Sequence, residues 1–247
     1  MGKISLRLTF MLIIFCPMLN WAPVGAADRL SPLLSVKLSL IAPVTFRCLG
    51  PVTLYYQPEK GLAKKPGLPL SSWAPVASEE INHLLTWQAR MMEGRIVFTS
   101  EQGDLVTSDL PLMLRSTAGD GFAVNGAHYP GTLVFWPDDD LLCFNEVSLE
   151  DYVCGVLGSE AYAGWPLEAL KANAVAIRSY TLYSLGKHGL FDLCDDVHCQ
   201  RYRGLSASPV FREAVQGTAG EVLTWRNRPI NAVYHSSSGG RAKNNDE

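Results

Sequence analysis

The second half of the chain holds two helix-forming segments in close succession, and they restrict the possible folds more than any other part of the sequence. Ser148 is followed three residues later by Asp151, the pattern of a capping box, and apolar residues then recur at helical spacing. This pattern predicts a short amphipathic helix that ends near Gly158. Glu160 then lies just past the helix end. There the exposed carbonyl groups form the negative end of the helix dipole, which disfavours a negative charge on the Glu160 carboxyl. Because a protonated carboxyl can act as a general acid, Glu160 is the candidate catalytic residue.

The second helix is predicted to begin at Trp165-Pro166 and to run to about Gly186. Most of its surface is apolar or aromatic, yet Lys171 and Arg178 fall on its apolar face. A buried cation without a partner is costly, so each is expected to meet a carboxylate, a group of carbonyls or a polar ligand in a cleft near Glu160. The alternative is that both side chains reach solvent or form structural pairs.

Strand patterns dominate the chain before these helices. Short apolar, β-branched and aromatic runs alternate with Gly, Pro and Asp turns, which is typical of strands. A helix is expected from Ser78 to Met92, and a hairpin from Glu221 to Tyr234 follows the long helices. The sequence therefore predicts an α+β fold, with short strands and hairpins packed around a buried helix in one main domain. The expected strands are Leu34–Leu40, Val44–Tyr56, Arg95–Thr99, Leu110–Arg115, Gly121–Val124, Gly131–Trp136 and Leu141–Val147.

The amino terminus has the pattern of a signal peptide. Lys3 and Arg7 precede an apolar run from Leu8 to Trp21, and small residues follow at Val24–Ala27, so residues 1–27 are predicted to be removed. No other segment is long enough to cross a bilayer. With 47% hydrophobic residues and a net charge of −3, the composition gives no indication of nucleic acid or an anionic membrane as partner. We expect a secreted protein, or one of the cell envelope in the periplasm or cell wall.

Four side chains with metal-binding chemistry lie close together after the second helix: His188, Cys194, His198 and Cys199. Two thiols and two imidazoles are a donor set for tetrahedral zinc. A disulfide between Cys194 and Cys199 is the alternative, because a secreted chain meets oxidising conditions. The spacing of the four residues is compatible with both a zinc site and a disulfide. If zinc binds, four protein ligands leave no free position, so the ion would be structural.

A glycine pair ends a polar loop near the end of the chain. Tyr234 and His235 precede three hydroxyl residues, Ser236, Ser237 and Ser238, and then the glycines. Such a loop offers donors suited to sugar hydroxyls and acetamides, although a plain turn is the alternative. Serine hydrolase chemistry is disfavoured, because the nucleophile motif G-x-S-x-G is absent from the sequence.

These motifs together resemble one known family. Residues 149–204 and 214–240 are similar to the SpoIID/LytB domain of sporulation lytic transglycosylases and amidase-enhancer proteins. The similarity runs from Leu133 to Gly240 and extends more loosely to the strand Ser35–Leu40. The acid of the family's Pro-Ser-Glu motif corresponds to Glu160, and this chain has Gly158 in place of the Pro. The resemblance also favours zinc over a disulfide in the Cys/His loop.

The resemblance implies an activity that needs a single carboxylate. Ordinary glycosidases use two, whereas a lytic transglycosylase can use one as both acid and base. It implies cleavage of peptidoglycan glycan strands by Glu160. Glu150 and Asp151 are the alternative carboxylates, but they occupy a first helical turn, where the helix dipole explains them. The competing hypothesis is a non-catalytic wall-binding module that stimulates a partner N-acetylmuramoyl-L-alanine amidase.

The expected organisation has three parts. Residues 1–27 form the signal peptide, 28–130 the amino-terminal β-rich part, and 131–247 the SpoIID/LytB core with the catalytic segment. Because the family's domain normally continues beyond the glycine pair, the core is expected to be truncated at its carboxyl end.

Overall fold

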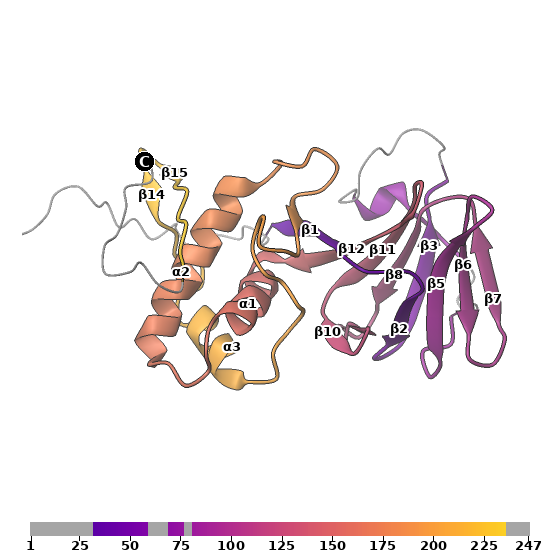
Figure 1. Ribbon diagram of the computed structural model, residues 1–247, viewed down its shortest axis with the longest axis horizontal. Coiled ribbons are helices and arrows are strands. Elements are labelled where there is room, and N and C mark those ends of the chain that lie inside the picture. Colours follow the sequence, from indigo (N-terminus) through magenta and orange to yellow (C-terminus); the bar gives the residue numbers. More distant parts are fainter. Residues whose placement is uncertain (1–31, 59–68, 77–80, 236–247) are drawn as a thin grey trace, which may run out of the picture.

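The computed structural model describes residues 32–58, 69–76 and 81–235. The predicted signal peptide and Ser236, Ser237 and Ser238 of the polar loop lie outside these residues. In the part of the chain that the structure describes, two β-sheets form one end of the molecule, and three α-helices with a two-stranded hairpin form the other (Figure 1). Within the described residues, no helix combines the length and apolar character needed to cross a membrane.

The larger sheet has seven strands and the smaller sheet has six. In both sheets, neighbouring strands pair antiparallel, except for β1 (Leu33–Leu38) and β13 (Leu193–Cys194) at one edge of the larger sheet, which pair parallel. The larger sheet has the order β13 (Leu193–Cys194), β1 (Leu33–Leu38), β12 (Leu141–Ser148), β11 (Thr132–Pro137), β8 (Leu112–Ser116), β3 (Val52–Tyr56) and β4 (Ala74–Pro75). The smaller has the order β10 (Ala127–Tyr129), β9 (Phe122–Val124), β2 (Val44–Cys48), β5 (Thr86–Met92), β6 (Arg95–Ser100) and β7 (Leu105–Ser108).

The two sheets pack against each other through aromatic side chains. Phe46 and Phe98 of the smaller sheet meet Phe135 of the larger sheet, with ring centroids 4.8–5.3 Å apart. All three rings are fully buried, and such tilted and edge-to-face pairs add to the stability that burial provides. These rings are part of the main apolar core, which continues into the helical end through residues such as Tyr152 and Leu170.

The helix expected from Ser78 to Met92 is wrong over all of its described residues, because residues 81–85 form a turn and no helix; Ser78 itself lies outside the described residues. Thr86–Met92 forms strand β5, in the middle of the smaller sheet. Trp87 and Ala89 are buried while Gln88 and Arg90 are exposed, so burial alternates as in a strand with one face in the core.

One further element is a short 3₁₀ turn, η1 (Leu70–Ser72), which precedes β4.

Helices α1 (Leu149–Glu160), α2 (Leu167–Ser184) and α3 (Pro209–Gln216) pack on one another beside β1 and β12 (Figure 1). The α+β class is confirmed, but the arrangement differs from the expected one. The sheets cover each other's apolar faces, so the helices lie at one end of the sandwich instead of inside a ring of strands. Helix α2 is not buried all round, since its Tyr183 is 49% exposed. The hairpin after α3 is short, with β14 (Thr224–Trp225) paired to β15 (Arg228–Pro229).

Candidate functional site

Helix α1 carries Glu160, and the predicted cap fixes where this helix begins. Ser148 Oγ accepts a hydrogen bond from the Asp151 backbone N–H at 3.2 Å and donates one to Asp151 Oδ2 at 2.8 Å. Ser148 is therefore confirmed as the N-cap of the helix, and Asp151 bonds to its hydroxyl. The helix continues two residues beyond the predicted end, so Glu160 is its last residue and Ala161 its C-cap.

The close approach of the loop before α3, and of α3 itself, explains the glycine two residues before this acid. A Cβ atom at Gly158 would lie 2.6 Å from Ser206 Cβ and 3.4 Å from the ring of Phe211 in α3. A side chain there would force these elements apart. The substitution of Gly for the family's Pro thus matches a local packing requirement of this chain, inside α1 rather than in a loop.

Two donors hold the Glu160 carboxylate at the surface. The Arg201 backbone N–H donates to Oε1 at 2.7 Å, and the Tyr234 hydroxyl donates a second hydrogen bond. Burial, and then the bond to Glu160, raise the pKa of Tyr234 well above its usual range, so this hydroxyl stays protonated. Glu160 itself is only half-buried, which leaves part of the carboxylate accessible to a ligand.

A buried glutamine supports Tyr234 from behind. Gln200 Nε2 donates to Tyr234 Oη at 3.1 Å and to the Ile177 carbonyl at 3.4 Å. Gln200 Oε1 accepts from Thr181 Oγ1 at 2.8 Å and from Tyr152 Oη at 3.4 Å. The amide therefore ties both α1 and α2 to the residue that contacts Glu160. Sequence reasoning missed Gln200, because a single Gln carries no local signal.

Each of the two helix cations has a carboxylate partner other than Glu160. Lys171 Nζ forms a surface ion pair with Glu168 Oε1 at 2.8 Å, one turn earlier in α2, and this contact raises the pKa of Lys171. Arg178 is buried and binds Glu150 through two hydrogen bonds, Nε to Oε1 at 2.9 Å and Nη2 to Oε2 at 2.7 Å. Glu150 is in the first turn of α1, about 15 Å along the helix from Glu160 at 1.5 Å per residue.

Arg178 also donates to two backbone carbonyls, those of Glu221 at 3.1 Å and Val215 at 3.4 Å. It therefore connects α1, α2 and the end of α3. The sequence left open whether these cations border a cleft or form structural ion pairs, and the contacts of Arg178 support a structural ion pair.

Two residues of the predicted polar loop are described. Tyr234 forms a hydrogen bond with Glu160, and the next residue, His235, is exposed.

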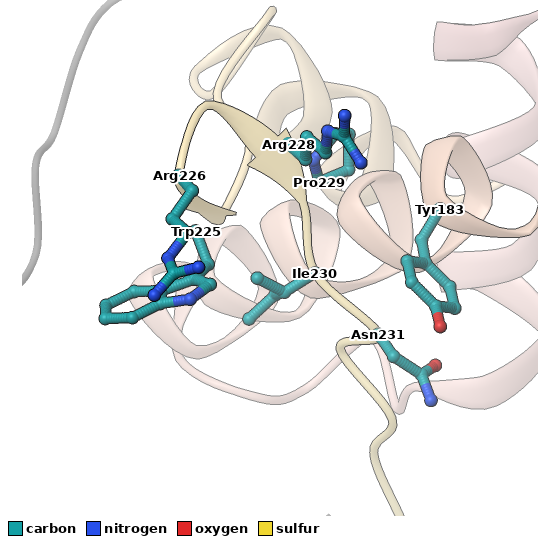
Figure 2. A pocket seen from close by; sticks show the side chains of 7 residues that line it. All are labelled: Tyr183, Trp225, Arg226, Arg228, Pro229, Ile230 and Asn231. Atoms are coloured by element: carbon teal, nitrogen blue, oxygen red, sulfur yellow. The ribbon is translucent and has the colours of Figure 1, made fainter.

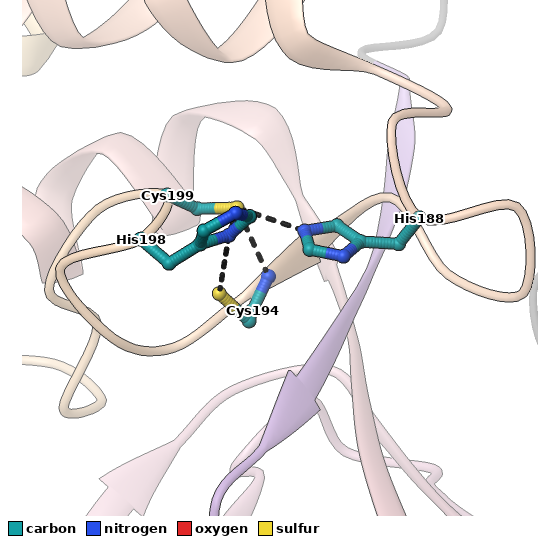
Figure 3. Close-up of side chains that lie close together, drawn as sticks. All are labelled: His188, Cys194, His198 and Cys199. Atoms are coloured by element: carbon teal, nitrogen blue, oxygen red, sulfur yellow. Dashed lines mark hydrogen bonds between the residues drawn. The ribbon is translucent and has the colours of Figure 1, made fainter.

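The Cys/His loop brings its four predicted ligands together (Figure 3). Their ligand atoms all lie within 4.8 Å of one another. His188 Nε2 is 3.0 Å from Cys199 Sγ, and His198 Nδ1 is 3.7 Å from both Cys194 Sγ and Cys199 Sγ. Zinc bonds of about 2.0–2.3 Å in a tetrahedron require donor separations of roughly 3.3–3.8 Å. The donor set and its spacing therefore fit zinc with small adjustments.

Neither loop cysteine forms a disulfide, and the same holds for the other described cysteines. Burial raises the pKa of the Cys199 thiol to about 11, while burial and the nearby His198 lower the pKa of His188. A neutral imidazole is ready to bind a metal, whereas the thiol must first release its proton. Cys143 and Cys154 are buried in β12 and α1.

Three consecutive residues join this cluster to Glu160. Cys199 belongs to the cluster, the Gln200 side chain supports Tyr234, and the Arg201 N–H binds the Glu160 carboxylate. We call residues 199–201 the connecting segment. The order of the Cys/His loop is thus coupled to the orientation of the candidate acid through one short stretch of backbone.

The candidate site thus combines a surface carboxylate, held by two hydrogen-bond donors, with a nearby Cys/His cluster in the helical end of the molecule. Residues 138–225, which contain α1, α2, α3, Glu160 and the cluster, match the family model SpoIID, described as stage II sporulation protein. This segment, about a third of the chain, is therefore similar to the SpoIID/LytB family.

Relatives from two bacteria are similar to part of this chain. The amidase enhancer of Bacillus subtilis is 38% identical over 93 residues, which is 38% of this chain and 13% of that protein. Stage II sporulation protein D of Bacillus subtilis is 33% identical over 116 residues, 40% of this chain and 34% of that protein. An uncharacterized protein of Brachyspira hyodysenteriae is 37% identical over 126 residues, 49% of this chain and 34% of that protein. The chain thus spans about a third or less of the length of these relatives.

Proposed function

We propose that this protein is a peptidoglycan lytic transglycosylase with Glu160 as its single acid and base. The observation that carries the proposal is the support of Glu160 within the family-matched segment: a half-buried carboxylate held by the Arg201 N–H and the Tyr234 hydroxyl. A group that serves as both acid and base must keep one orientation through both proton transfers. The buried Gln200 behind Tyr234 supplies that rigidity.

The proposed reaction moves one proton out and one back. Protonated Glu160 donates to the glycosidic oxygen as the bond to the muramoyl anomeric carbon breaks. The substrate's own acetamide stabilises the cationic centre that forms. The ionised Glu160 then takes the proton of the muramoyl 6-hydroxyl as that oxygen bonds to the anomeric carbon. The product is a 1,6-anhydro end, and the carboxyl is again protonated.

In this proposal, zinc in the Cys/His loop has a structural role. Bound by His188, Cys194, His198 and Cys199, it would supply folding free energy and leave no free coordination position. The ligand residues hold the connecting segment, and with it the Arg201 N–H, in place against α1. The substrate is glycan strands of the cell wall, reached after export to the cell envelope.

A second function is supported by one comparison. The relative with 38% identity over 93 residues is named amidase enhancer. The same domain would then bind the wall and stimulate an N-acetylmuramoyl-L-alanine amidase without cutting glycan. The two functions differ in one respect that an assay detects, the appearance of anhydro ends with no amidase present.

The test uses peptidoglycan stripped of stem peptides, with anhydro products detected by mass spectrometry. Glu160→Gln keeps the shape and removes the acid, so turnover should fall by about two orders of magnitude or more, the usual size of general acid catalysis. The matched control is Glu213→Gln, an exposed carboxylate of α3, which should keep full activity. Cleavage retained in Glu160→Gln, with an unchanged melting temperature, would refute the assignment. An absence of products from the parent protein, with stimulation of an added amidase, would establish the second function.

A further inference from the structure

One pocket lies between the β14–β15 hairpin and α2, in the helical end that also carries Glu160 (Figure 2). A second and smaller pocket lies in the β-sandwich, outside the segment that matches the family model. Its volume is about 220 Å³, below the roughly 300–1,000 Å³ of most small-molecule sites. The size therefore suits one small chemical group, such as the last residue of a peptide. The pocket is lined by Arg47, Cys48, Leu49, His83 and Leu84.

Hydrogen bonds to the fold hold the two backbone segments that frame this pocket. In the turn before β5, Asn82 Oδ1 accepts a hydrogen bond from the Leu84 N–H at 2.9 Å. The Asn82 carbonyl accepts another from Nε1 of the buried Trp87 at 3.0 Å, which ties the turn to the core. Directly after β2, the Leu49 N–H donates to the Gly121 carbonyl at 3.1 Å. The frame is therefore formed before a ligand arrives, so binding has little backbone to order.

The lining combines donors that favour an anion with apolar walls. Arg47 is exposed and forms no ion pair with any other residue in the described part of the chain, so its guanidinium is available to a ligand carboxylate. His83 is half-buried and can donate a ring N–H. Leu49 is 37% exposed and Leu84 is 74% exposed, so both leave apolar surface open. Burial raises the pKa of the Cys48 thiol to about 12, and this wall therefore stays uncharged.

This combination matches a carboxylate next to a small apolar group. None of the lining residues is acidic, so no lining side chain would repel a bound anion. A water molecule occupies about 30 Å³ in the liquid, which gives the pocket room for a group the size of about seven waters. A peptide that ends in alanine carries its free carboxylate and a methyl group on the same carbon atom. Such an end fits the volume, the charge and the apolar surface together.

We propose that this pocket binds the free carboxyl end of a peptidoglycan stem peptide that ends in D-alanine. Arg47 and His83 bind the carboxylate, and Leu49 and Leu84 contact the methyl group. The inference rests on the proposed function for its choice of peptide, because a protein that acts on the cell wall meets stem peptides there. It gives the β-sandwich a contact with the wall that is separate from Glu160 in the helical end (Figure 1).

The test is an NMR titration of the full chain with no glycan present. The probes are N-acetyl-D-alanyl-D-alanine and its carboxyl-terminal amide, which has the same shape without the charge. We expect the acid to bind with a Kd of about 1 mM or tighter, and about tenfold or more tightly than the amide, the size of one charge-assisted hydrogen bond. Arg47→Gln should remove this preference, while Arg47→Lys should keep part of it. Leu84→Ser should weaken the binding of both probes.

The matched control is Arg90→Gln, which changes an exposed arginine on β5 of the same sheet and should leave both affinities unchanged. Equal affinity for the acid and the amide, or a preference that survives Arg47→Gln in a folded variant, would overturn the inference. Tighter binding of N-acetyl-L-alanyl-L-alanine than of the D-form would also overturn it, in favour of the carboxyl end of a protein. The probes contain no glycosidic bond, so peptide binding can hold while Glu160-dependent cleavage fails, and the reverse.

Discussion

Replacing Glu150 by Gln should destabilise the helical end strongly, because it leaves a buried positive charge without its counter-ion. The Arg178 side chain is 1% exposed, and both Glu150 oxygens accept its hydrogen bonds. In Glu150→Gln the amide NH2 replaces one of these oxygens and faces an arginine donor. Removing one partner of a buried pair costs about 3–5 kcal/mol. We expect the low end, about 3 kcal/mol, because the Glu150 side chain is 32% exposed and water can partly replace it.

For a domain of this size, 3 kcal/mol corresponds to a fall in melting temperature of about 6–12 °C. Thermal unfolding followed by circular dichroism measures this directly. The matched control is Glu168→Gln, which breaks the exposed pair with Lys171 and should leave the melting temperature unchanged.

A double-mutant cycle then isolates the pair. Arg178→Met removes the buried charge, so the variant that carries both changes should be more stable than the sum of the single effects predicts, by about 1 kcal/mol or more. A melting temperature for Glu150→Gln within about 2 °C of the parent, or an additive cycle, would show that Arg178 is solvated in solution and would refute this reasoning.

Three other predictions concern separate parts of the molecule. Tyr234→Phe keeps the ring and removes the donor to Glu160, so turnover should fall about tenfold or more with little change in KM, and equal turnover would contradict a positioning role. Chelator dialysis should lower the melting temperature of the parent but not of Cys199→Ser; finding no zinc by elemental analysis, together with a Cys194–Cys199 disulfide by mass spectrometry, would contradict the metal site. Burial raises the pKa of the Cys48 thiol from 9.0 to about 12, so its contribution to stability is complete below pH 9 and is lost as pH rises towards 12. Unfolding free energies of Cys48→Ala measured across this pH range should therefore decline less than those of the parent.

The sequence predicted the helices of the site because their signals are local. The capping pattern at Ser148 and the Pro at the start of the second helix fixed both beginnings to within about a residue. The grouping of the Cys/His ligands was also predictable, because all four lie in one loop between positions 188 and 199. Whether that loop holds zinc stays a prediction.

The rest depends on contacts between distant parts of the chain. Apolar residues from Ile81 to Ala89 match a helical face as well as a strand, and only pairing with β2 and β6 decides for the strand. Arg178 could be recognised as needing a partner, but Glu150 is 28 residues away and no spacing rule connects them. The support of Glu160 by Tyr234 has the same origin, since the two side chains meet only after the chain passes through α2 and α3.

The connecting segment places a restriction on how this protein can vary. Each of its three residues contacts a different partner: Cys199 the Cys/His cluster, Gln200 the Tyr234 hydroxyl and Arg201 the Glu160 carboxylate. Only two peptide bonds separate Cys199 from Arg201, so the fold fixes the distance between them. The neighbouring Val197 is 80% exposed and makes no such demand. Substitutions at Val197 should therefore be accepted freely. A single residue inserted between positions 199 and 201 would move either the thiol or the amide out of reach, and the loop should tolerate changes of composition far better than changes of length.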